Sequence, residues 1–481
     1  MTTQTRNRWT LIAVSLATFM TYLDNNVTNV TMPAIQRDLH LSTAGLEWVV
    51  SGYILVFASL LLAGGRLGDL FGRRRLFLLG LGIFTLASLA AGLAGSADIL
   101  IASRAVQGLG AALVTPTTLA LISSNYPDPR ERTTAVGVWS AVGALALAVG
   151  PLLGGAISQH ASWGWIFFIN VPFGIATMAL AAWAVPADEP AEKRSGMDLP
   201  GLVLSAGGLF ALTYALIEGH GKGWTSTVIL GSFAISAVAL LAFVAVELRT
   251  AEPMVDVALF RERVFTGGIV AVLMWGFGLF GIYFFTSLYL QNALGFSATE
   301  AGAAFVPMAL LMAVGAIVSE RVAHAIGAHR SVGLAMALMA AGIGSMSLLG
   351  AHASYLALMP SFALIGIGGG LSVPLTAMVL GAMPTDQAGV ASGIFNAARE
   401  VAGLLGITVI GAVLTARQSA ALRTGSTPVD AFLTGYRSGL VVAALLVAAG
   451  GVAAYVGLRG TKQRGLDAED AVAAEPVLTA V

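Results

Sequence analysis

The sequence predicts an all-α polytopic membrane protein with fourteen transmembrane helices, arranged as two six-helix bundles plus two inserted helices. Composition, the spacing of apolar stretches and an internal repeat carry this prediction. Of the 481 residues, 57% are hydrophobic and only 10% are charged, whereas soluble domains carry roughly 25% charged residues. A water-soluble core cannot bury so much apolar surface, so lipid is the expected solvent.

Apolar stretches recur along the whole chain. A window of about 19 residues, which crosses roughly 30 Å of hydrocarbon as a helix, locates each one. The expected spans are 9–33, 46–65, 76–95, 98–122, 134–158, 164–185, 199–218, 227–247, 264–290, 301–319, 331–350, 354–380, 393–415 and 436–457.

The charges test this count, because Lys and Arg prefer cytoplasmic loops. With a cytoplasmic N-terminus, most of the 25 Lys and Arg residues fall on the cytoplasmic side, and one helix more or fewer would scramble the bias. We therefore expect both termini in the cytoplasm. Arg far outnumbers Lys, and Ala and Gly abound, which is typical of a GC-rich bacterial genome. The expected location is the bacterial inner (cell) membrane.

An internal repeat pairs the first six spans with the last six. Matching positions include Gly108, Gly110 and Pro116 with Gly366, Gly368 and Pro374, Arg66, Gly72 and Arg75 with Arg321, Gly327 and Arg330, and Gln36 and Ser42 with Gln291 and Ser297. Two related halves with the substrate between them are typical of transporters. The expected domains are a bundle over 1–190, an inserted pair with connectors over 191–262, a bundle over 263–458 and a disordered cytoplasmic tail over 459–481.

Several function classes are excluded by what the chain lacks. Without cysteine there are no disulfides or thiolates, and the net charge of zero argues against a nucleic-acid partner. The histidines do not have metal-ligand spacing, so no metal site is expected. Glycine runs lie inside spans, and a phosphate-loop lysine is missing. We expect no cofactor and no enzyme activity, which leaves the proton gradient as the energy source.

Four motifs in order resemble the major facilitator superfamily over nearly the whole chain. Residues 65–75 are similar to its loop signature between spans 2 and 3, and Arg104, Gln107, Gly108 and Gly110 match its fourth-helix motif. Gly143, Gly150, Pro151, Gly154 and Gly155 match the fifth-helix signature of its antiporters. Leu23 and Asp24, followed by Val27, Asn29, Val30 and Pro33, resemble the first-helix motif of the fourteen-span drug:proton antiporters.

This resemblance implies the major facilitator fold and proton-coupled export of lipophilic, cationic drugs or antibiotics by alternating access. Two departures from the family pattern stand out. Asn25 and Asn26 replace small or β-branched residues, and the segment Trp163-Gly164-Trp165 lacks an arginine usual between the tryptophans. Export or import of a physiological metabolite on the same fold is the alternative, and a membrane enzyme or receptor is the rival of a different class.

The loop after the second span is expected to act as a conformational latch. Gly65 and Gly72 permit a tight reversal, Asp69 can accept hydrogen bonds from a helix N-terminus, and Arg73 holds the loop in the cytoplasm. A cluster of arginines that only sets the topology is the alternative.

The antiporter helix is thin and bendable. Gly150 and Gly154 let another helix approach closely, and Pro151 removes a backbone hydrogen bond between them. The resemblance suggests that this helix seals the two halves against uncoupled leak, while packing without a coupling role stays open.

Asp24 is the central candidate for proton coupling. A carboxylate deep in a span costs roughly 2.5–3.5 kcal/mol, so it persists where it faces a cavity or a partner. Asp24, Thr28 and Thr31 share one helix face, which is expected to look inward. Loss of hydration favours the protonated acid and a cationic cargo favours the charged form, so proton and cargo can compete for one site. A purely structural Asp is the alternative.

Two further charged residues lie within spans. Arg104 enters the fourth span from the outer side and can share a depth with Asp24; coupling that changes between states and a static ion pair are both open. Glu400, beside Arg399, can serve protons or cationic cargo, or can pair locally with Arg399.

Polar and aromatic residues on the inward faces are expected to line a cargo cavity, through stacking or cation–π contact where they are aromatic. The candidates are Tyr22, Asn26, Asn29, Tyr53, Gln107, Trp275, Phe280, Tyr283 and Asn396. Packing and interfacial anchoring are the alternatives for each aromatic ring. The expected partners are a small lipophilic or cationic substrate, protons and the lipid bilayer, with the protein acting as a monomer.

Overall fold

The computed structural model describes residues 3–187, 198–250, 253–381, 383 and 388–459, and these residues fold into helices joined by short loops. The first half consists of α1 (Thr3–Leu39), α2 (Thr43–Phe71), α3 (Arg73–Gly92), α4 (Ala97–Asn125), α5 (Pro129–His160), α6 (Trp165–Phe168) and α7 (Asn170–Ala184). The inserted pair is α8 (Leu199–Lys222) and α9 (Thr227–Glu247). The second half consists of the 3-10 helix η1 (Val257–Arg261), α10 (Arg263–Asn292), α11 (Ala298–Ala304), α12 (Val306–Ile326), α13 (Ala328–Met346), α14 (Tyr355–Leu371), α15 (Pro374–Gly381), α16 (Ala388–Arg423) and α17 (Pro428–Gly457).

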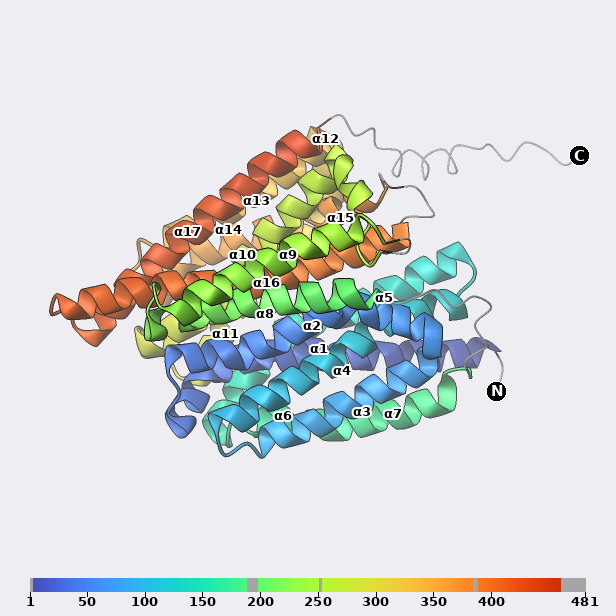
Figure 1. Ribbon diagram of the computed structural model, residues 1–481, viewed down its shortest axis with the longest axis horizontal. Coiled ribbons are helices and arrows are strands. Elements are labelled where there is room, and N and C mark those ends of the chain that lie inside the picture. The colour runs from blue at the N-terminus through green and yellow to red at the C-terminus, as the bar shows by residue number, and fades with distance from the viewer. Residues whose placement is uncertain (1–2, 188–197, 251–252, 382, 384–387, 460–481) are drawn as a thin grey trace, which may run out of the picture.

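The long helices run roughly parallel to one direction. Figure 1 shows α1–α7 as one layer below and α10–α17 as a second layer above, with α8 and α9 lying across the junction. In Figure 1 α17 runs from the left to the top of the molecule, where it ends, and α1 begins at the right-hand end. We call this end the N-terminal face and the other end the opposite face.

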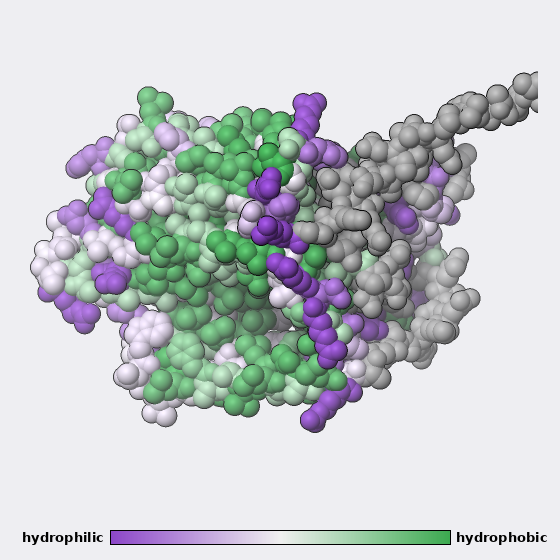
Figure 2. All heavy atoms as spheres, turned by 90° about the horizontal axis from the view of Figure 1, so that it is seen from above, coloured by the Kyte–Doolittle hydropathy of each residue, from purple (hydrophilic) through white to green (hydrophobic). Residues whose placement is uncertain are grey.

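Length and composition suit these helices to a membrane. In the described part of the chain, eleven helical segments are long and apolar enough to cross a bilayer. Figure 2 shows apolar residues over the middle of one side, with hydrophilic residues gathered toward the two ends. An apolar belt between polar ends is what a spanning bundle requires, because lipid offers no hydrogen bonds to backbone or side chains.

Several helices extend beyond the expected spans. Whereas 9–33 and 393–415 are the predicted limits, α1 covers Thr3–Leu39 and α16 covers Ala388–Arg423. Hydropathy marks only the part in hydrocarbon, and the helix continues until a turn residue stops it. The spans 164–185, 301–319 and 354–380 are interrupted near Ile169, Phe305 and Ser372. The division at 190 and the tail over 460–481 lie outside the described residues.

The internal repeat is visible in matching turns of the two halves. Ser42 caps the N-terminus of α2 through its side chain, and Ser297 caps α11 in the same way. Gly72 and Gly327 both adopt positive φ, 100° and 88°, at the junctions α2–α3 and α12–α13. Glycine is required there because other residues disfavour that backbone region.

Matching glycines also bring three helices together in each half. A Cβ at Gly108 of α4 would lie 3.2 Å from the carbonyl carbon of Tyr53 in α2, and one at Gly110 would lie 2.7 Å from the amide nitrogen of Phe84 in α3. In the second half, Gly366 and Gly368 press α14 against α12 and α13 in the same manner. The repeated glycines therefore set the packing of α4 between α2 and α3, and of α14 between α12 and α13.

We expect Gly108→Val to reduce folding strongly. The added side chain meets the backbone of α2, which cannot move as a flexible side chain can, and overpacking of this kind costs about 1–3 kcal/mol. The matched control is Gly207→Val in α8, where a Cβ would meet nothing within 4 Å. Thermal stability in detergent should fall for the first variant and stay near wild type for the second. Equal stability of the two variants would contradict this packing.

The inserted helix α8 bridges the two halves. It packs against α2 and α16, while α9 packs against α8 and is otherwise turned outward. On the α2 side, Trp48 donates its indole N–H to Glu218 at 3.0 Å, and its ring contacts Tyr214 with centroids 6.4 Å apart. On the α16 side, His220 and Ser419 are hydrogen bonded at 2.7 Å.

Candidate transport site

Asp24 lies at the centre of a buried polar network inside the first bundle. Asp24 is only 2% exposed to solvent. One carboxylate oxygen accepts hydrogen bonds from Asn170 of α7 at 2.7 Å and from Gln107 of α4 at 3.1 Å. The other forms an ion pair with Arg104 of α4, which is fully buried. Three donors, one of them charged, thus hold a single carboxylate: the acid lies on α1, and its partners lie on α4 and α7.

Arg104 is itself held by several groups. Its Nε donates to the carbonyl of Val49 in α2 at 3.1 Å, and its Nη1 donates to the Gln107 side-chain oxygen at 2.9 Å. The guanidinium carbon lies 4.5 Å from the ring centroid of Tyr53. The Nη2 atom has no hydrogen-bond partner. Because a guanidinium stays charged, it keeps a counter-charge in this dry site only as long as Asp24 is ionised.

Gln107 extends the network to α3. Its amide nitrogen donates to Ser88 at 2.7 Å, and the Ser88 hydroxyl donates in turn to the carbonyl of Phe84 at 2.8 Å. The network therefore joins α1, α3, α4 and α7, and a change in the charge of Asp24 acts on all four helices at once.

The inward polar face expected for α1 is present. Asp24, Thr28 and Thr31 are all buried. Thr28 donates to the Asp24 carbonyl at 2.7 Å and Thr31 donates to the Val27 carbonyl at 3.0 Å. These local bonds satisfy the hydroxyl groups within the helix, so the Asp24 carboxylate is left to α4 and α7.

Glu400 and Arg399 of α16 bring charge from the second half to the junction. They form an ion pair at 3.2 Å, and Arg399 also donates to the Tyr22 hydroxyl of α1 at 3.5 Å. The Tyr53 hydroxyl lies within electrostatic range of both Asp24 and Glu400. Tyr22 of α1 therefore joins the first half to the charged pair of α16.

The other cargo-cavity candidates are divided between the bundles and their junction. Asn26 bonds the Tyr22 carbonyl at 2.7 Å, and the side-chain oxygen of buried Asn29 has no partner. The Asn396 side-chain amide donates to the Ser392 carbonyl of the same helix at 2.9 Å.

The aromatic candidates of α10 pack inside the second half. Phe280 lies against Gly403, where a Cβ would come within 3.0 Å of its ring, and Tyr283 stacks on Phe305 with centroids 4.8 Å apart. The indole nitrogen of Trp275 is buried without a partner. These residues line neither of the two cavities described below, so their role as a cargo site stays a prediction.

The antiporter helix α5 lies against α1 and against the second half. A Cβ at Gly143 would lie 3.1 Å from the Tyr22 ring and one at Gly150 would lie 2.7 Å from Asn26. At Gly154 it would lie 2.6 Å from the Val27 carbonyl oxygen. The glycine face of α5 is therefore filled by the α1 backbone, and Ser158 adds a hydrogen bond to Thr31 at 2.9 Å.

The opposite edge of α5 closes against α11. A Cβ at Gly155 would lie 2.8 Å from the Cα of Thr299, and one at Gly302 would lie 2.7 Å from the carbonyl carbon of Pro151. We call this contact the α5–α11 seam. Near it, Gln291 of α10 donates to the Val30 carbonyl of α1 at 2.9 Å. The two halves are thus joined closely toward the opposite face.

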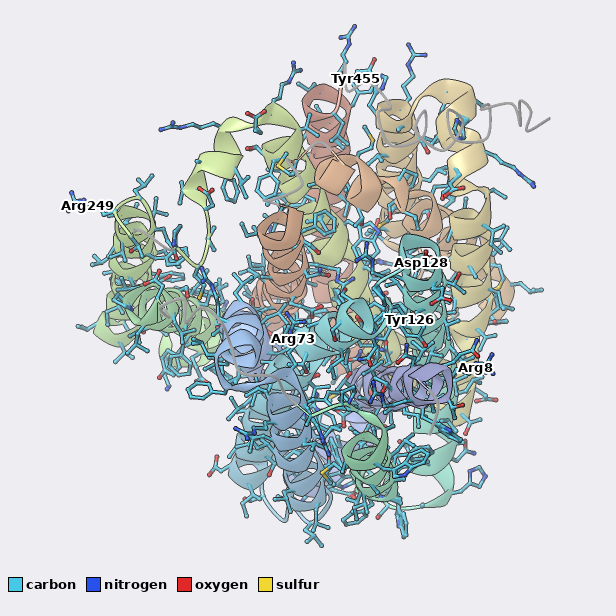
Figure 3. The ribbon with its side chains drawn as sticks, turned by 90° about the vertical axis from the view of Figure 1, so that its right-hand side faces the viewer. Arg8, Arg73, Tyr126, Asp128, Arg249 and Tyr455 are labelled. Atoms are coloured by element: carbon cyan, nitrogen blue, oxygen red, sulfur yellow. The ribbon has the colours of Figure 1, made fainter. Side chains whose placement is uncertain are left out.

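Among the described residues, one cavity lies toward each end of the molecule. The smaller, about 380 Å³, lies beside the seam and is lined by both halves, including Ala34, Ser158 and Asn292. The larger, about 1090 Å³, opens at the N-terminal face between α1, α4 and α5. Figure 3 shows Arg8, Arg73 and Tyr126 together at this face.

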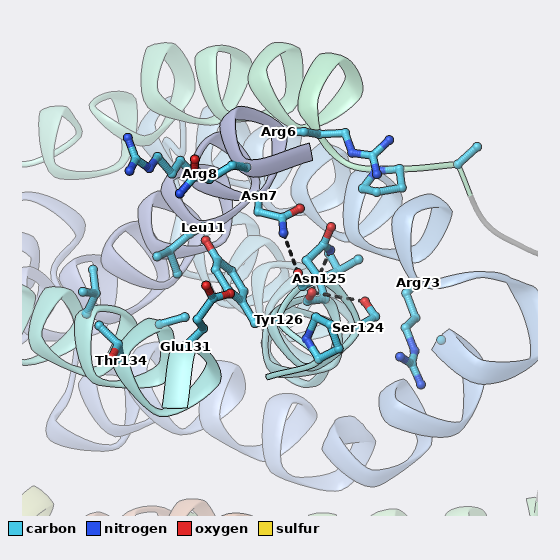
Figure 4. A pocket seen from close by; sticks show the side chains of 18 of the residues that line it. Arg6, Asn7, Arg8, Leu11, Arg73, Ser124, Asn125, Tyr126, Glu131 and Thr134 are labelled. Carbon is cyan, nitrogen blue, oxygen red and sulfur yellow. Dashed lines mark hydrogen bonds between the residues drawn. The ribbon is translucent and has the colours of Figure 1, made fainter. Parts of the chain in front are cut away.

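The larger cavity is polar at its mouth. In Figure 4, Asn7 bonds the Asn125 carbonyl, at 2.6 Å, while Arg6 and Arg73 stand at the rim. Burial and the Glu131 carboxylate raise the pKa of the Tyr126 phenol, so this side chain stays neutral.

The latch candidates lie beside this cavity. Gly72 and Arg73 line it, and Arg73 donates to the Ala120 carbonyl of α4 at 3.3 Å. Gly65 packs near Pro116, at 3.7 Å from its expected Cβ. The side chain of Asp69 lies outside the described part of the structure, so its role in a latch stays a prediction.

Sequence reasoning missed three residues of these sites. Asn170 and Ser88 complete the Asp24 network, and Glu47 of α2 is a buried acid whose Oε2 has no partner. Each is a polar side chain inside an apolar stretch, which is the signal that drew attention to Asp24. Glu47 lies against Gly411 of α16, where an added Cβ would overlap its carboxylate.

Comparisons with known proteins agree with this architecture. The family model described as Major Facilitator Superfamily matches residues 14–407. A tetracenomycin C resistance and export protein of Streptomyces glaucescens is 36% identical over 410 residues, covering 85% of this chain and 76% of the relative. The cephamycin export protein CmcT of Amycolatopsis lactamdurans is 39% identical over 406 residues, covering 83% of each. The crystal structure of the POT family transporter PepTSo has a TM-score of 0.69 at 15% identity, with 94% of this chain and 98% of that one covered.

The family model and the export proteins that this chain matches indicate a membrane transporter rather than an enzyme. The chain belongs to the Major Facilitator Superfamily.

Proposed function

We propose that this protein is a proton-coupled antiporter that exports small lipophilic, cationic drugs or antibiotics across the bacterial inner membrane by alternating access. The observation that carries the proposal is the buried carboxylate of Asp24, held by Arg104, Gln107 and Asn170. An ionisable group inside a membrane protein is a functional candidate, because its burial is costly. The names of the relatives, which are antibiotic resistance and export proteins, support the cargo class.

The network supplies a mechanism for exchange. Ionised Asp24 holds Arg104 and accepts bonds from α4 and α7. When Asp24 takes up a proton, Arg104 loses its counter-charge, and the four helices of the network must repack. Through Tyr53 and Tyr22 the change reaches Glu400 and Arg399 of the second half. A cationic cargo near either acid favours its ionised form, so cargo binding and proton binding oppose each other.

The described conformation corresponds to the inward-open state in this proposal. The N-terminal face is cytoplasmic in this proposal, as the distribution of Lys and Arg favours. The cavity of about 1090 Å³ then opens to the cytoplasm, while the α5–α11 seam closes the outer side. Gly72, Arg73 and Asp69 form the latch that closes the cytoplasmic side in the opposite state.

Three helices bring the proposed number of spans to fourteen. Besides the eleven apolar segments, α1, α5 and α13 contain 37, 32 and 19 residues. Each is long enough to cross about 28 Å or more at 1.5 Å per residue, and each packs among spanning helices. The fourteen spans form two six-helix bundles plus the inserted pair α8–α9. We propose that the protein acts as a monomer.

Everted membrane vesicles provide the test. Respiration acidifies the vesicle lumen, and a pH-sensitive dye records proton release when lipophilic cations or neutral compounds are added. We expect cationic compounds to release protons only from vesicles that contain the protein, and uptake of those compounds to stop when an ionophore dissipates the pH gradient. Uptake that continues without the gradient would contradict proton coupling.

A further inference from the structure

Two carboxylates meet at the N-terminal-face end of the inserted pair. Asp198 precedes α8 and caps it, because its Oδ1 accepts the Gly201 N–H at 2.9 Å. Glu247 is the last residue of α9, and its Oε2 accepts the Val255 N–H at 3.1 Å. The two residues are only 9% and 3% exposed. One oxygen of each acid is therefore used to fix backbone, in α8 and in the connector that leads to α10.

The remaining two oxygens face each other. Asp198 Oδ2 and Glu247 Oε1 are both buried without a hydrogen-bond partner. Both lie over the Cα of Gly201, where an added Cβ would be 2.7 Å from Glu247 Oε1 and closer still to Asp198 Oδ2. Two ionised carboxylates offer acceptors only, so neither can satisfy the other. A single proton turns one of them into a donor and satisfies both.

No cation of the described residues is hydrogen bonded to these two oxygens. Arg249, two residues beyond Glu247, points away from the inserted pair at its outer edge (Figure 3). Asp256 of the connector is engaged with the Ala258 N–H at 2.9 Å. Arg66 of α2, which also packs against α8, already takes part in an interaction. On α16 the first charged residue of the helix is Arg399, about three turns from its start.

We propose that Asp198 and Glu247 bind one proton between them and form a proton-binding site that is separate from Asp24. The bound proton forms a hydrogen bond that links the start of α8 to the end of α9. Because Glu247 also accepts the Val255 N–H, the same bond stabilises the connector that leads to the second bundle. Loss of the proton leaves two buried like charges side by side, which repel. The connector is therefore held firmly at low pH and released as the pH rises.

Hydrogen exchange on the full-length protein in lipid nanodiscs tests the site. The readout is the protection of the Val255 amide, corrected for the intrinsic rate, from about pH 5 to about pH 9. Each pH unit above the titration is expected to lower the protection by up to about tenfold in the wild type. In Glu247→Gln the new side-chain amide donates a hydrogen bond to Asp198, and no shared proton is needed. Protection of the Val255 amide should therefore stay constant across this pH range. Asp198→Asn should behave alike and covers the case in which the first variant does not fold.

Asp256→Asn is the matched control. It removes a carboxylate of the same connector, and that carboxylate accepts the Ala258 N–H at the start of η1. It should keep the pH response of the wild type. A response that persists in both Glu247→Gln and Asp198→Asn, or protection restored at high pH by magnesium or calcium ions, would overturn the proposal. The readout does not involve transport, so it stands or falls independently of drug:proton exchange.

Discussion

Replacement of Asp24 by asparagine is expected to abolish drug-dependent proton release. Asparagine has nearly the same shape and still offers an oxygen to Asn170 and Gln107, but it cannot bind a proton in this range of pH. In everted vesicles, release on addition of a lipophilic cation should fall to the level of vesicles without the protein. Asp24→Glu keeps an acid at the site and should retain part of the response.

Folding must be separated from coupling in this experiment. Asp24→Asn leaves Arg104 as an uncompensated buried charge, and breaking a buried pair on one side costs about 3–5 kcal/mol. The double variant Asp24→Asn, Arg104→Gln removes both charges and should recover stability without recovering proton release. Normal proton release by either variant would remove Asp24 from the mechanism.

Widening the α5–α11 seam is expected to open the opposite face. In Gly155→Val the new side chain meets the backbone at Ala298 and Thr299, which belongs to the other half. Overpacking costs about 1–3 kcal/mol, which corresponds to a shift of roughly 5- to 150-fold between the two states. Coupled export should fall, because the closed seam can no longer form fully.

A single cysteine reports the opening directly, since the natural chain contains none. Ala34→Cys places a thiol in the smaller cavity beside the seam. A membrane-impermeant maleimide applied from the opposite face should label it faster when Gly155→Val is also present. Gly137→Val is the matched control in the same helix, because a Cβ there meets nothing within 4 Å. Equal labelling rates in the two backgrounds would show that the seam does not control access.

Much of the fold follows from composition and period alone. Apolar stretches locate the helices, and the repeated glycines locate their close contacts, because Gly108 and Gly366 are recognisable as a pair in the sequence itself. Hydropathy does not locate the ends of helices such as α1 and α16, because polar residues can continue a helix outside the lipid. It also does not reveal the breaks near Ile169, Phe305 and Ser372, since the apolar character is unbroken there.

The sequence predicted a site residue only where its side chain is charged and therefore costly to bury in a membrane span. Asp24, Arg104 and Glu400 stand out as charges in apolar stretches. Which groups surround them depends on helix rotation and depth, and a single sequence does not fix these. Ser88 and Asn170 are ordinary polar residues until α3 and α7 bring them to Asp24. For the same reason Gln107, expected to line a cargo cavity, is instead fully buried within the network.

The bridging position of α8 has a consequence for any rocking of the two halves. When α2 and α16 move apart, α8 has to part from one of them. On the α2 side it is tied by the Trp48–Glu218 hydrogen bond and by ring contacts, whereas the His220–Ser419 bond ties it to α16. The weaker contact, between α8 and α16, is expected to break first. The inserted pair should therefore move together with the first bundle and slide along the surface of α16 once in each transport cycle.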